Sequence, residues 1–134
     1  MHETFEHKAD IGIRGKGKTV KEAFTEAAKA MFSVQANIKK IKASKKIKIS
    51  CKAENKEELF IEWLNALLSQ SSLKNMLFSK FKITRLDKNK LQGFAFGEKI
   101  KKEHQLRTEV KAATYSGLKI YKKKSWIVEC VVDV

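Results

Sequence analysis

The sequence contains no proline, and in 134 residues it has only 6 glycines and 2 cysteines. No Pro- or Gly-rich linker divides the chain, so residues 1–134 are predicted to form a single domain. Cys51 and Cys130 lie far apart, without metal-ligand spacing and in alternating patterns typical of strands. They are therefore predicted to be buried core thiols, not metal ligands or nucleophiles.

Long apolar runs are also missing. No stretch approaches the roughly 20 residues that a membrane-spanning helix requires, and residues 1–6, MHETFE, do not have the pattern of a secretory signal. The cytoplasm is therefore the expected compartment.

Most enzyme signatures are absent as well. The chain has no GxSxG, no P-loop, no dinucleotide-binding glycine pattern and no HExxH. The segment Gly15-Lys16-Gly17-Lys18 precedes a predicted helix and could hold a phosphate on its N–H groups. It lacks the spacing of a P-loop, however, and is better interpreted as a basic turn that ends a strand. The chain is not expected to be an enzyme.

The residue type present in excess is lysine. Lys and Arg number 29 against 15 Asp and Glu, which gives a formal net charge of +14. Such an excess favours a polyanionic partner such as RNA, or an acidic protein surface, but a lysine-rich surface equally suits a heat-adapted organism. The basic residues are spread along the chain without an arginine block interleaved with aromatics, so a basic surface is expected and a specific groove is not.

The hydrophobic pattern predicts an α+β domain of the order β-α-β-α followed by antiparallel strands, with two helices packed against β-sheet. Helical spacing predicts one helix from Val20 to Val34, begun by a Thr19 and Glu22 capping box, and a second helix capped by Asn55. Alternation of apolar and polar residues predicts strands, the third and fourth joined by a turn at 87–90. These strands are residues 10–14, 46–52, 81–83, 91–96 and 126–133. Residues 108–121 are predicted to be mostly extended.

The first candidate site is the segment from Phe5 to Ile13, which places His7 and Asp10, with Glu6 beside them, near the start of a strand. From these residues alone, the favoured interpretation is that Asp10 caps a turn and His7 is a half-exposed loop residue.

The second candidate site is the segment Val131-Val132-Asp133-Val134, which keeps a strong β pattern to its last residues. If it forms a strand, the α-carboxylate of Val134 lies next to the Asp133 side chain. Clustered carboxylates repel each other unless a cation or hydrogen bonds compensate, and oxygen ligands suit Ca²⁺, Mg²⁺ or Mn²⁺. The alternative is a solvated end without a ligand.

The stretch from Leu106 to Leu118 mixes charges with small apolar residues. Arg107, Glu109 and Lys111 would share one face if it were a strand, and a row of this kind is usually a cross-strand ion ladder. A partner surface is the alternative interpretation.

Taken together, these stretches resemble the archease family. The resemblance covers essentially the whole chain and rests on segments that occur in the same order. These segments are residues 5–13, FEHKADIGI; 22–24 and 30–32, EAF and AMF; 62–65 and 67–68, EWLN and LL; 107–112 and 114–118, RTEVKA and TYSGL; and 132–134, VDV.

The resemblance implies a protein cofactor of the RtcB-type RNA ligase of tRNA splicing. That ligase joins RNA ends through a guanylylated histidine of its own, with GTP and Mn²⁺, and the archease promotes guanylylation so that the ligase turns over repeatedly. The resemblance also implies a metal site for a divalent ion, expected to be Ca²⁺, whose ligands here would be Asp10, Asp133 and Val134. His7 is predicted to orient Asp10. Such a site requires the first and last predicted strands to lie side by side.

The sequence departs from the family pattern at Lys8, Ala66 and Ser116, and Lys8 adds positive charge beside the proposed metal site. Two other functions remain open. One is a chaperone-like module that binds tRNA through the basic surface and tunes a tRNA-modifying enzyme. The other is a metal-dependent phosphohydrolase, which ranks last because such sites commonly hold two metals with a richer ligand set.

Overall fold

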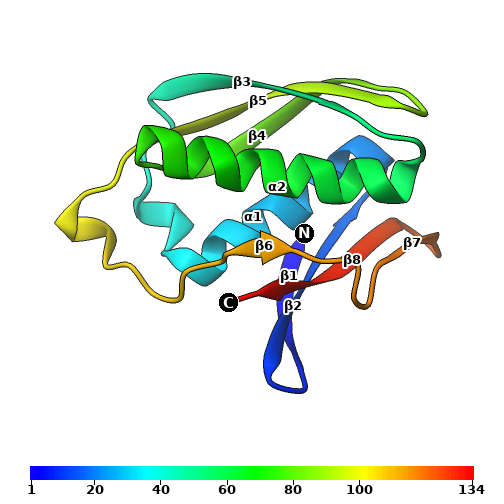
Figure 1. The fold of residues 1–134 in the computed structure, drawn as a ribbon, viewed down its shortest axis with the longest axis horizontal. Coiled ribbons are helices and arrows are strands. Elements are labelled where there is room, and N and C mark those ends of the chain that lie inside the picture. The colour runs from blue at the N-terminus through cyan, green and yellow to red at the C-terminus, as the bar shows by residue number, and fades with distance from the viewer.

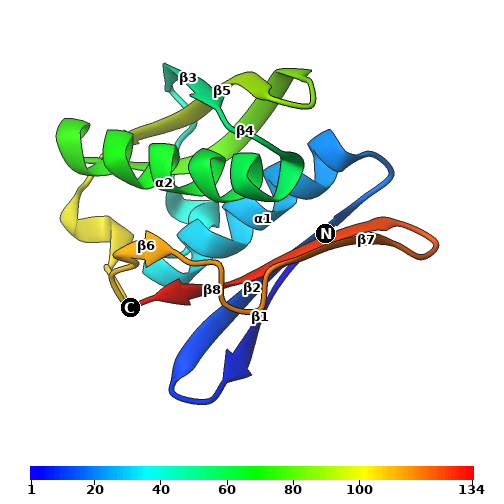
Figure 2. The ribbon, with the colours of Figure 1, turned by 45° about the vertical axis from the view of Figure 1, so that its right-hand side comes forward.

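The computed structural model describes residues 1–134 and contains two long helices between two antiparallel sheets (Figures 1 and 2). The helices are α1, Val20–Gln35, and α2, Lys56–Lys74. The strands are β1, His2–His7; β2, Asp10–Gly17; β3, Lys45–Lys52; β4, Met76–Leu86; β5, Lys90–Lys99; β6, Ala112–Ala113; β7, Lys119–Lys122; and β8, Trp126–Asp133. Short 3₁₀ turns follow α1, at Ile38–Lys40, and β5, at Lys102–His104. No helix combines the length and apolar composition needed to cross a membrane.

The larger sheet has five strands, and β8 lies in its interior. The order is β1-β2-β8-β6, and β7 also pairs with β8, further from the end of that strand. The pairing of β2 with β8 joins residues more than a hundred positions apart, for example Ile13 with Cys130. The two ends of the sequence therefore meet in one sheet, as the proposed metal site requires.

The smaller sheet consists of β3, β5 and β4, with β5 in the centre. Its inward face carries apolar side chains such as Ile49, Leu91 and Ile83, all of them buried. The alternating residues of the same strands point away from the helices. The outward face of this sheet is not covered by any other element (Figures 1 and 2).

Helix α1 begins with the predicted capping box. The Thr19 hydroxyl accepts a hydrogen bond from the Glu22 N–H at 3.1 Å, and the Glu22 carboxylate accepts one from the Lys18 N–H at 3.3 Å. The face of small residues on α1 lies on β2, where a Cβ atom at Gly15 would collide with the backbone of Ala23 and Ala27. Glycine at this position therefore allows the helix to lie close to the strand.

Helix α2 is the central packing element. The Asn55 side chain caps it by accepting from the Glu58 N–H at 2.8 Å, and Asn75 ends it in the left-handed region at φ 53°. Its buried residues lie on more than one side of the helix, because the smaller sheet and α1 both contact it. The buried Trp63 side chain donates a hydrogen bond from Nε1 to the Phe24 carbonyl at 3.1 Å, which ties α2 to α1.

The structure confirms the α+β class, both helices and the turn between β4 and β5. It corrects two details. A strand precedes the first predicted one, β1 over His2–His7, and β2 continues through the glycines to Gly17. Residues 108–121 contain only the short strands β6 and β7. Both helices contact both sheets, because α1 and α2 are apolar on enough of their surface to be covered from two sides.

Both cysteines are buried, as predicted. Burial raises the pKa of the Cys130 thiol to about 12 and that of the Cys51 thiol to about 11. At neutral pH these thiols therefore stay protonated, and neither is an activated nucleophile.

Candidate metal centre

The two predicted aspartates lie at the same end of the larger sheet. Ile11 pairs with Val132 in the register of β2 and β8, and continuing this register by one residue places Asp10 opposite Asp133. On the other side of β2, His7 pairs with Asp10. The residues His7, Asp10 and Asp133 thus form one row across three neighbouring strands, although they come from opposite ends of the sequence.

Both aspartate side chains point to the outward face of this sheet. Arg14 and Glu129 form an ion pair on that face, at 2.7 Å between Nε and Oε1. Asp10 and Asp133 are each four residues away from this pair along their strands, and side chains an even number of residues apart share a face. Residues directly opposite each other across two strands have Cβ atoms about 4.5–5.5 Å apart, so the two carboxylates can approach one ligand together.

Neither aspartate has a cationic partner. Both side chains are exposed, and their carboxylates take part in no ion pair and accept no hydrogen bond from the rest of the chain. Like charges directly opposite each other destabilise a sheet. A cation between Asp10 and Asp133 would remove this repulsion.

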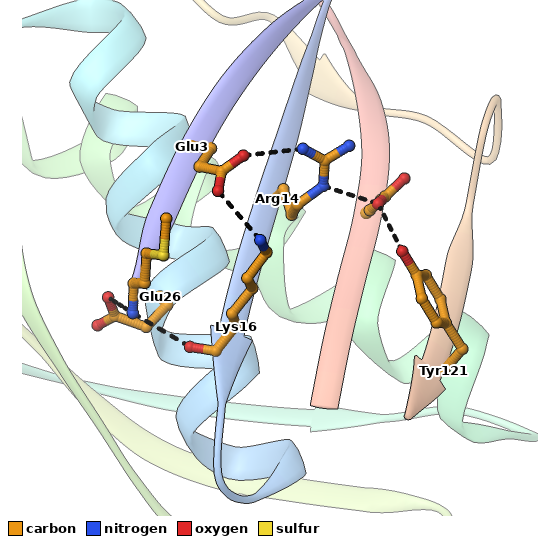
Figure 3. Close-up of polar contacts among 7 residues, drawn as sticks. Glu3, Arg14, Lys16, Glu26 and Tyr121 are labelled. Carbon is orange, nitrogen blue, oxygen red and sulfur yellow. Dashed lines mark hydrogen bonds and ion pairs between the residues drawn. The ribbon is translucent and has the colours of Figure 1, made fainter. Parts of the chain in front are cut away.

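The glutamates of the same sheet, Glu3 on β1 and Glu129 on β8, have basic partners (Figure 3). Arg14 lies between Glu3 and Glu129, with Nη1 2.8 Å from Glu3, and Lys16 is 3.2 Å from Glu3. The Tyr121 hydroxyl donates to Glu129 at 3.2 Å. The Arg14 side chain, with Lys16, lowers the pKa of the Glu3 carboxyl. Glu3 and Glu129 are therefore neutralised by basic partners, whereas Asp10 and Asp133 are left without one.

His7 is the last residue of β1 and is half-buried. Its Nδ1 atom is buried without a hydrogen-bond partner, and no hydrogen bond joins its side chain to that of Asp10. Lys8 follows in the left-handed region at φ 55°, so that only two residues turn the chain from β1 into β2. The expectation of a loop at His7 is wrong, because His7 is held in the sheet opposite Asp10.

The end of β8 is held from its other side by β6. The Lys111 N–H donates to the Asp133 carbonyl at 2.8 Å, and both the N–H and the hydroxyl of Thr114 donate to the Val131 carbonyl. Asn65 of α2 accepts from the Ala113 N–H at 2.8 Å and donates to the Ala113 carbonyl at 3.3 Å. Asn65 thereby fixes β6, and β6 fixes the strand end that carries Asp133.

The ion ladder predicted for Arg107, Glu109 and Lys111 is wrong. These residues are exposed in an irregular segment, and none of them forms an ion pair. The segment is anchored to the end of α1 through its backbone, where the Arg107 N–H donates to the Gln35 carbonyl at 2.8 Å. This attachment of the segment to α1 was not predicted from the sequence, because contacts of an irregular backbone give no periodic pattern of residues.

Asp10 and Asp133 carry oxygen ligands of the kind that a hard cation takes. No three His, Cys, Asp or Glu side chains in the structure lie together as a metal-binding group, so Asp10 and Asp133 require a third ligand. The carboxyl group of Val134 is next to Asp133 in the chain. The side chain of Val134 packs against the hydrophobic core. Oxygen ligands of this kind suit Ca²⁺, Mg²⁺ or Mn²⁺, and their charge offsets that of the ion.

Comparison with known proteins gives one consistent result. The model of the archease protein family (MTH1598/TM1083) matches residues 2–134. The archease of Pyrococcus furiosus is 38% identical over 138 residues and that of Sulfurisphaera tokodaii 40% identical over 135 residues, each match covering 98% of this chain and 97% of the relative.

Solved structures agree with the sequence comparison. The solution structure of Methanobacterium thermoautotrophicum protein 1598 superposes with a TM-score of 0.85 at 32% identity, over 99% of this chain and 98% of that one. The crystal structure of a Thermotoga maritima archease, described as a possible chaperone, has a TM-score of 0.66 at 23% identity, over 100% of this chain and 98% of that one, and supports the fold alone. A full-length family match, close relatives along the whole sequence and the same arrangement of helices and sheets agree: this chain belongs to the archease family.

Proposed function

We propose that this protein activates an RtcB-type RNA ligase in tRNA splicing by promoting its guanylylation, and that it does so through a divalent cation held by Asp10, Asp133 and the carboxylate of Val134. The observation that carries the proposal is the row in which Asp10 and Asp133 lie opposite each other without any cationic partner. The choice of this ligase as the partner rests on what the family resemblance implies, and the chain belongs to that family.

The residues of this chain supply position and charge. Asp10 pairs with His7 on β1 and Asp133 pairs with Ala112 on β6, so the backbone of each aspartate is held by a neighbouring strand and presents its carboxylate at the same end of the sheet. A bound Ca²⁺, Mg²⁺ or Mn²⁺ ion would supply positive charge for a phosphate oxygen. The nucleophile is the histidine of the ligase, so no nucleophile from this chain is required.

His7 has a supporting role in this proposal. It is paired with Asp10, and its buried Nδ1 lacks a partner. A small shift of the ring or the carboxylate would let His7 orient Asp10 by a hydrogen bond, as residues beside metal ligands commonly do.

The experiment measures ligase guanylylation and RNA joining over many turnovers with the variants Asp10→Asn and Asp133→Asn, and with a chain extended past Val134. Loss of even a neighbouring partner of a metal ligand typically lowers affinity or activity about 10- to 100-fold. We therefore expect each of these changes to lower multiple turnover at least about tenfold. Calorimetric titration of the same variants with Ca²⁺, Mg²⁺ and Mn²⁺ should show a parallel loss of binding.

The matched control is Asp87→Asn. Asp87 is the only other aspartate of the chain and lies in the turn between β4 and β5, where it pairs with Arg85 on the surface. The substitution removes the same carboxylate and changes the net charge by the same amount, but far from Asp10 and Asp133. It should leave both turnover and metal binding unchanged. Wild-type turnover with Asp10→Asn, with Asp133→Asn and with the chain extended past Val134 would remove the site from the mechanism.

A further inference from the structure

The outward face of the smaller sheet combines lysines with aromatic rings. On the central strand β5 this face carries Phe94 and Phe96, both half-exposed. The flanking strands place a lysine directly opposite each ring on both sides. The two rows are Lys46–Phe96–Lys80 and Lys48–Phe94–Lys82.

Two of these four lysines place their ammonium groups over the rings. The Nζ of Lys46 is 4.2 Å from the centroid of Phe94, and the Nζ of Lys80 is 5.3 Å from that of Phe96. The rings are therefore covered by flexible side chains and not by another element of the fold (Figures 1 and 2).

The charge of this face is not neutralised. The three strands carry eight lysines and one arginine, and their only acidic residue is Glu98, which is buried. None of the four lysines beside the rings forms an ion pair. On the larger sheet, by contrast, Glu3 and Glu129 pair with Arg14 and Lys16 (Figure 3).

We infer that this face binds single-stranded RNA, with bases stacked on Phe94 and Phe96 and phosphates on the flanking lysines. Two residues of one strand face are roughly 7 Å apart, which sets two rings side by side along β5. An uncovered sheet with aromatic rings and basic flanks suits unpaired bases, because every base has a flat face and every linkage a negative charge. This surface is separate from the edge that carries Asp10, and the inference does not depend on the ligase proposal.

Displacement of the ammonium groups by bases is favourable. An exposed cation–π contact changes an equilibrium by about two- to fivefold, whereas a base stacked on an aromatic side chain changes it by about five- to more than a hundredfold. A lysine displaced from a ring keeps its charge and can reach a phosphate. Binding thus replaces a weak contact inside the protein with a stack and an ion pair.

Neutral polar groups on the same face favour RNA over DNA. Gln92 lies two residues before Phe94 on the same face of β5, and Ser50 lies opposite Gln92 on β3. Neither side chain donates or accepts a hydrogen bond within the protein. Both can therefore form hydrogen bonds with base edges or with ribose 2′-hydroxyls. DNA lacks the 2′-hydroxyl, so the second kind of bond favours RNA.

The test measures the fluorescence anisotropy of a labelled ten-nucleotide single-stranded RNA across a salt series. The variants Phe94→Leu and Phe96→Leu keep an apolar side chain but remove the ring, and each should weaken binding about tenfold. Replacing Lys46, Lys48, Lys80 and Lys82 by Gln should weaken binding and lower the salt slope by about 0.7 for each phosphate that a replaced lysine had bound. Far-UV circular dichroism confirms that each variant is folded.

The matched control replaces four other exposed lysines by Gln, which changes the net charge equally. These are Lys102, Lys119, Lys123 and Lys124. An equal loss of binding in this control, or unchanged binding in both leucine variants, would show that only net charge attracts the RNA and would overturn the inference. Equal binding of a duplex, of the DNA of the same sequence or of polyglutamate as competitor would likewise overturn the assignment to single-stranded RNA.

Discussion

At the scale of single residues, Glu98 shows how the fold holds a charge in a buried position. Its carboxylate accepts hydrogen bonds from the Lys42 N–H at 2.7 Å, from the His104 Nε2 at 3.0 Å and from the Lys101 ammonium at 3.0 Å. His104 accepts the Lys101 N–H on Nδ1 at 2.9 Å, so the nitrogen that donates to Glu98 is Nε2. The Lys42 bond, followed by those of His104 and Lys101, lowers the pKa of Glu98 to about 2.

This lowered pKa predicts a loss of stability in acid. The ordinary pKa of the group is 4.5, so the stabilisation by ionised Glu98 is fully present above about pH 4.5 and is lost as the pH falls towards 2. The variant Glu98→Gln lacks this contribution at every pH. Its melting temperature should therefore be lower than that of the wild type near neutrality and should fall less steeply below pH 4.5, as followed by circular dichroism.

The control for this prediction is Glu103→Gln. Glu103 is a neighbouring glutamate whose side chain is 70% exposed and 3.8 Å from Lys101. The melting temperature of Glu103→Gln should depend on pH in the same way as that of the wild type. Parallel curves for the wild type and Glu98→Gln would contradict the role assigned to Glu98.

At the scale of elements, β6 shows how two residues can position a site. The strand has only two pairs with β8, Ala112 with Asp133 and Ala113 with Val132. Two hydrogen bonds from Asn65 hold it against α2. The Trp-Leu-Asn segment that marked the family resemblance thus has a physical role, because its asparagine connects the central helix to the strand end that carries Asp133.

Loss of this amide is predicted to loosen the edge of the sheet. Asn65→Ala leaves the N–H and carbonyl of Ala113 without their partners, which costs about 1–3 kcal/mol of unfolding free energy. Hydrogen exchange should accelerate at the amides of Lys111 and Thr114, which bond to β8. Ser69→Ala, on an exposed position of α2, is the control and should change neither stability nor exchange. Unaltered exchange in Asn65→Ala would show that β6 is held by other contacts.

At the scale of the whole molecule, the two sheets are joined through the helix layer that lies between them. Phe24 of α1 packs on Phe60 of α2 with ring centroids 5.0 Å apart, and Trp63 bonds to the Phe24 carbonyl. Trp63 also contacts Phe81 of the smaller sheet, at 6.3 Å between centroids. The core is thus continuous from one sheet to the other, and the molecule should unfold as one unit.

The variant Trp63→Phe tests this continuity. It removes the indole hydrogen bond and leaves a cavity, so it should lower the free energy of unfolding by about 2–4 kcal/mol. It also leaves Trp126 of β8 as the only tryptophan. Urea transitions followed by Trp126 fluorescence, which reports the larger sheet, and by far-UV circular dichroism, which reports all elements, should coincide. Separate midpoints would show that the two sheets unfold independently.

Elements with local signals could be predicted from the residues alone. Thr19 and Asn55 mark the starts of both helices, because a cap is made within four residues, and the alternation from Trp126 to Asp133 predicts β8. The sequence also separated the buried cysteines from candidate ligands. It missed β1, where the polar and charged residues from His2 to His7 weaken the alternation.

Which distant residues meet became known only from the folded arrangement of the strands. Nothing local to Asp10 or Asp133 shows that they share a row, since that depends on the register of two strands more than a hundred residues apart. The same holds for Phe94 and Phe96, which are ordinary strand residues until β3 and β4 place lysines on both sides of them. Pairing between strands is non-local, so the sequence carries the chemistry of these surfaces and the fold supplies their geometry.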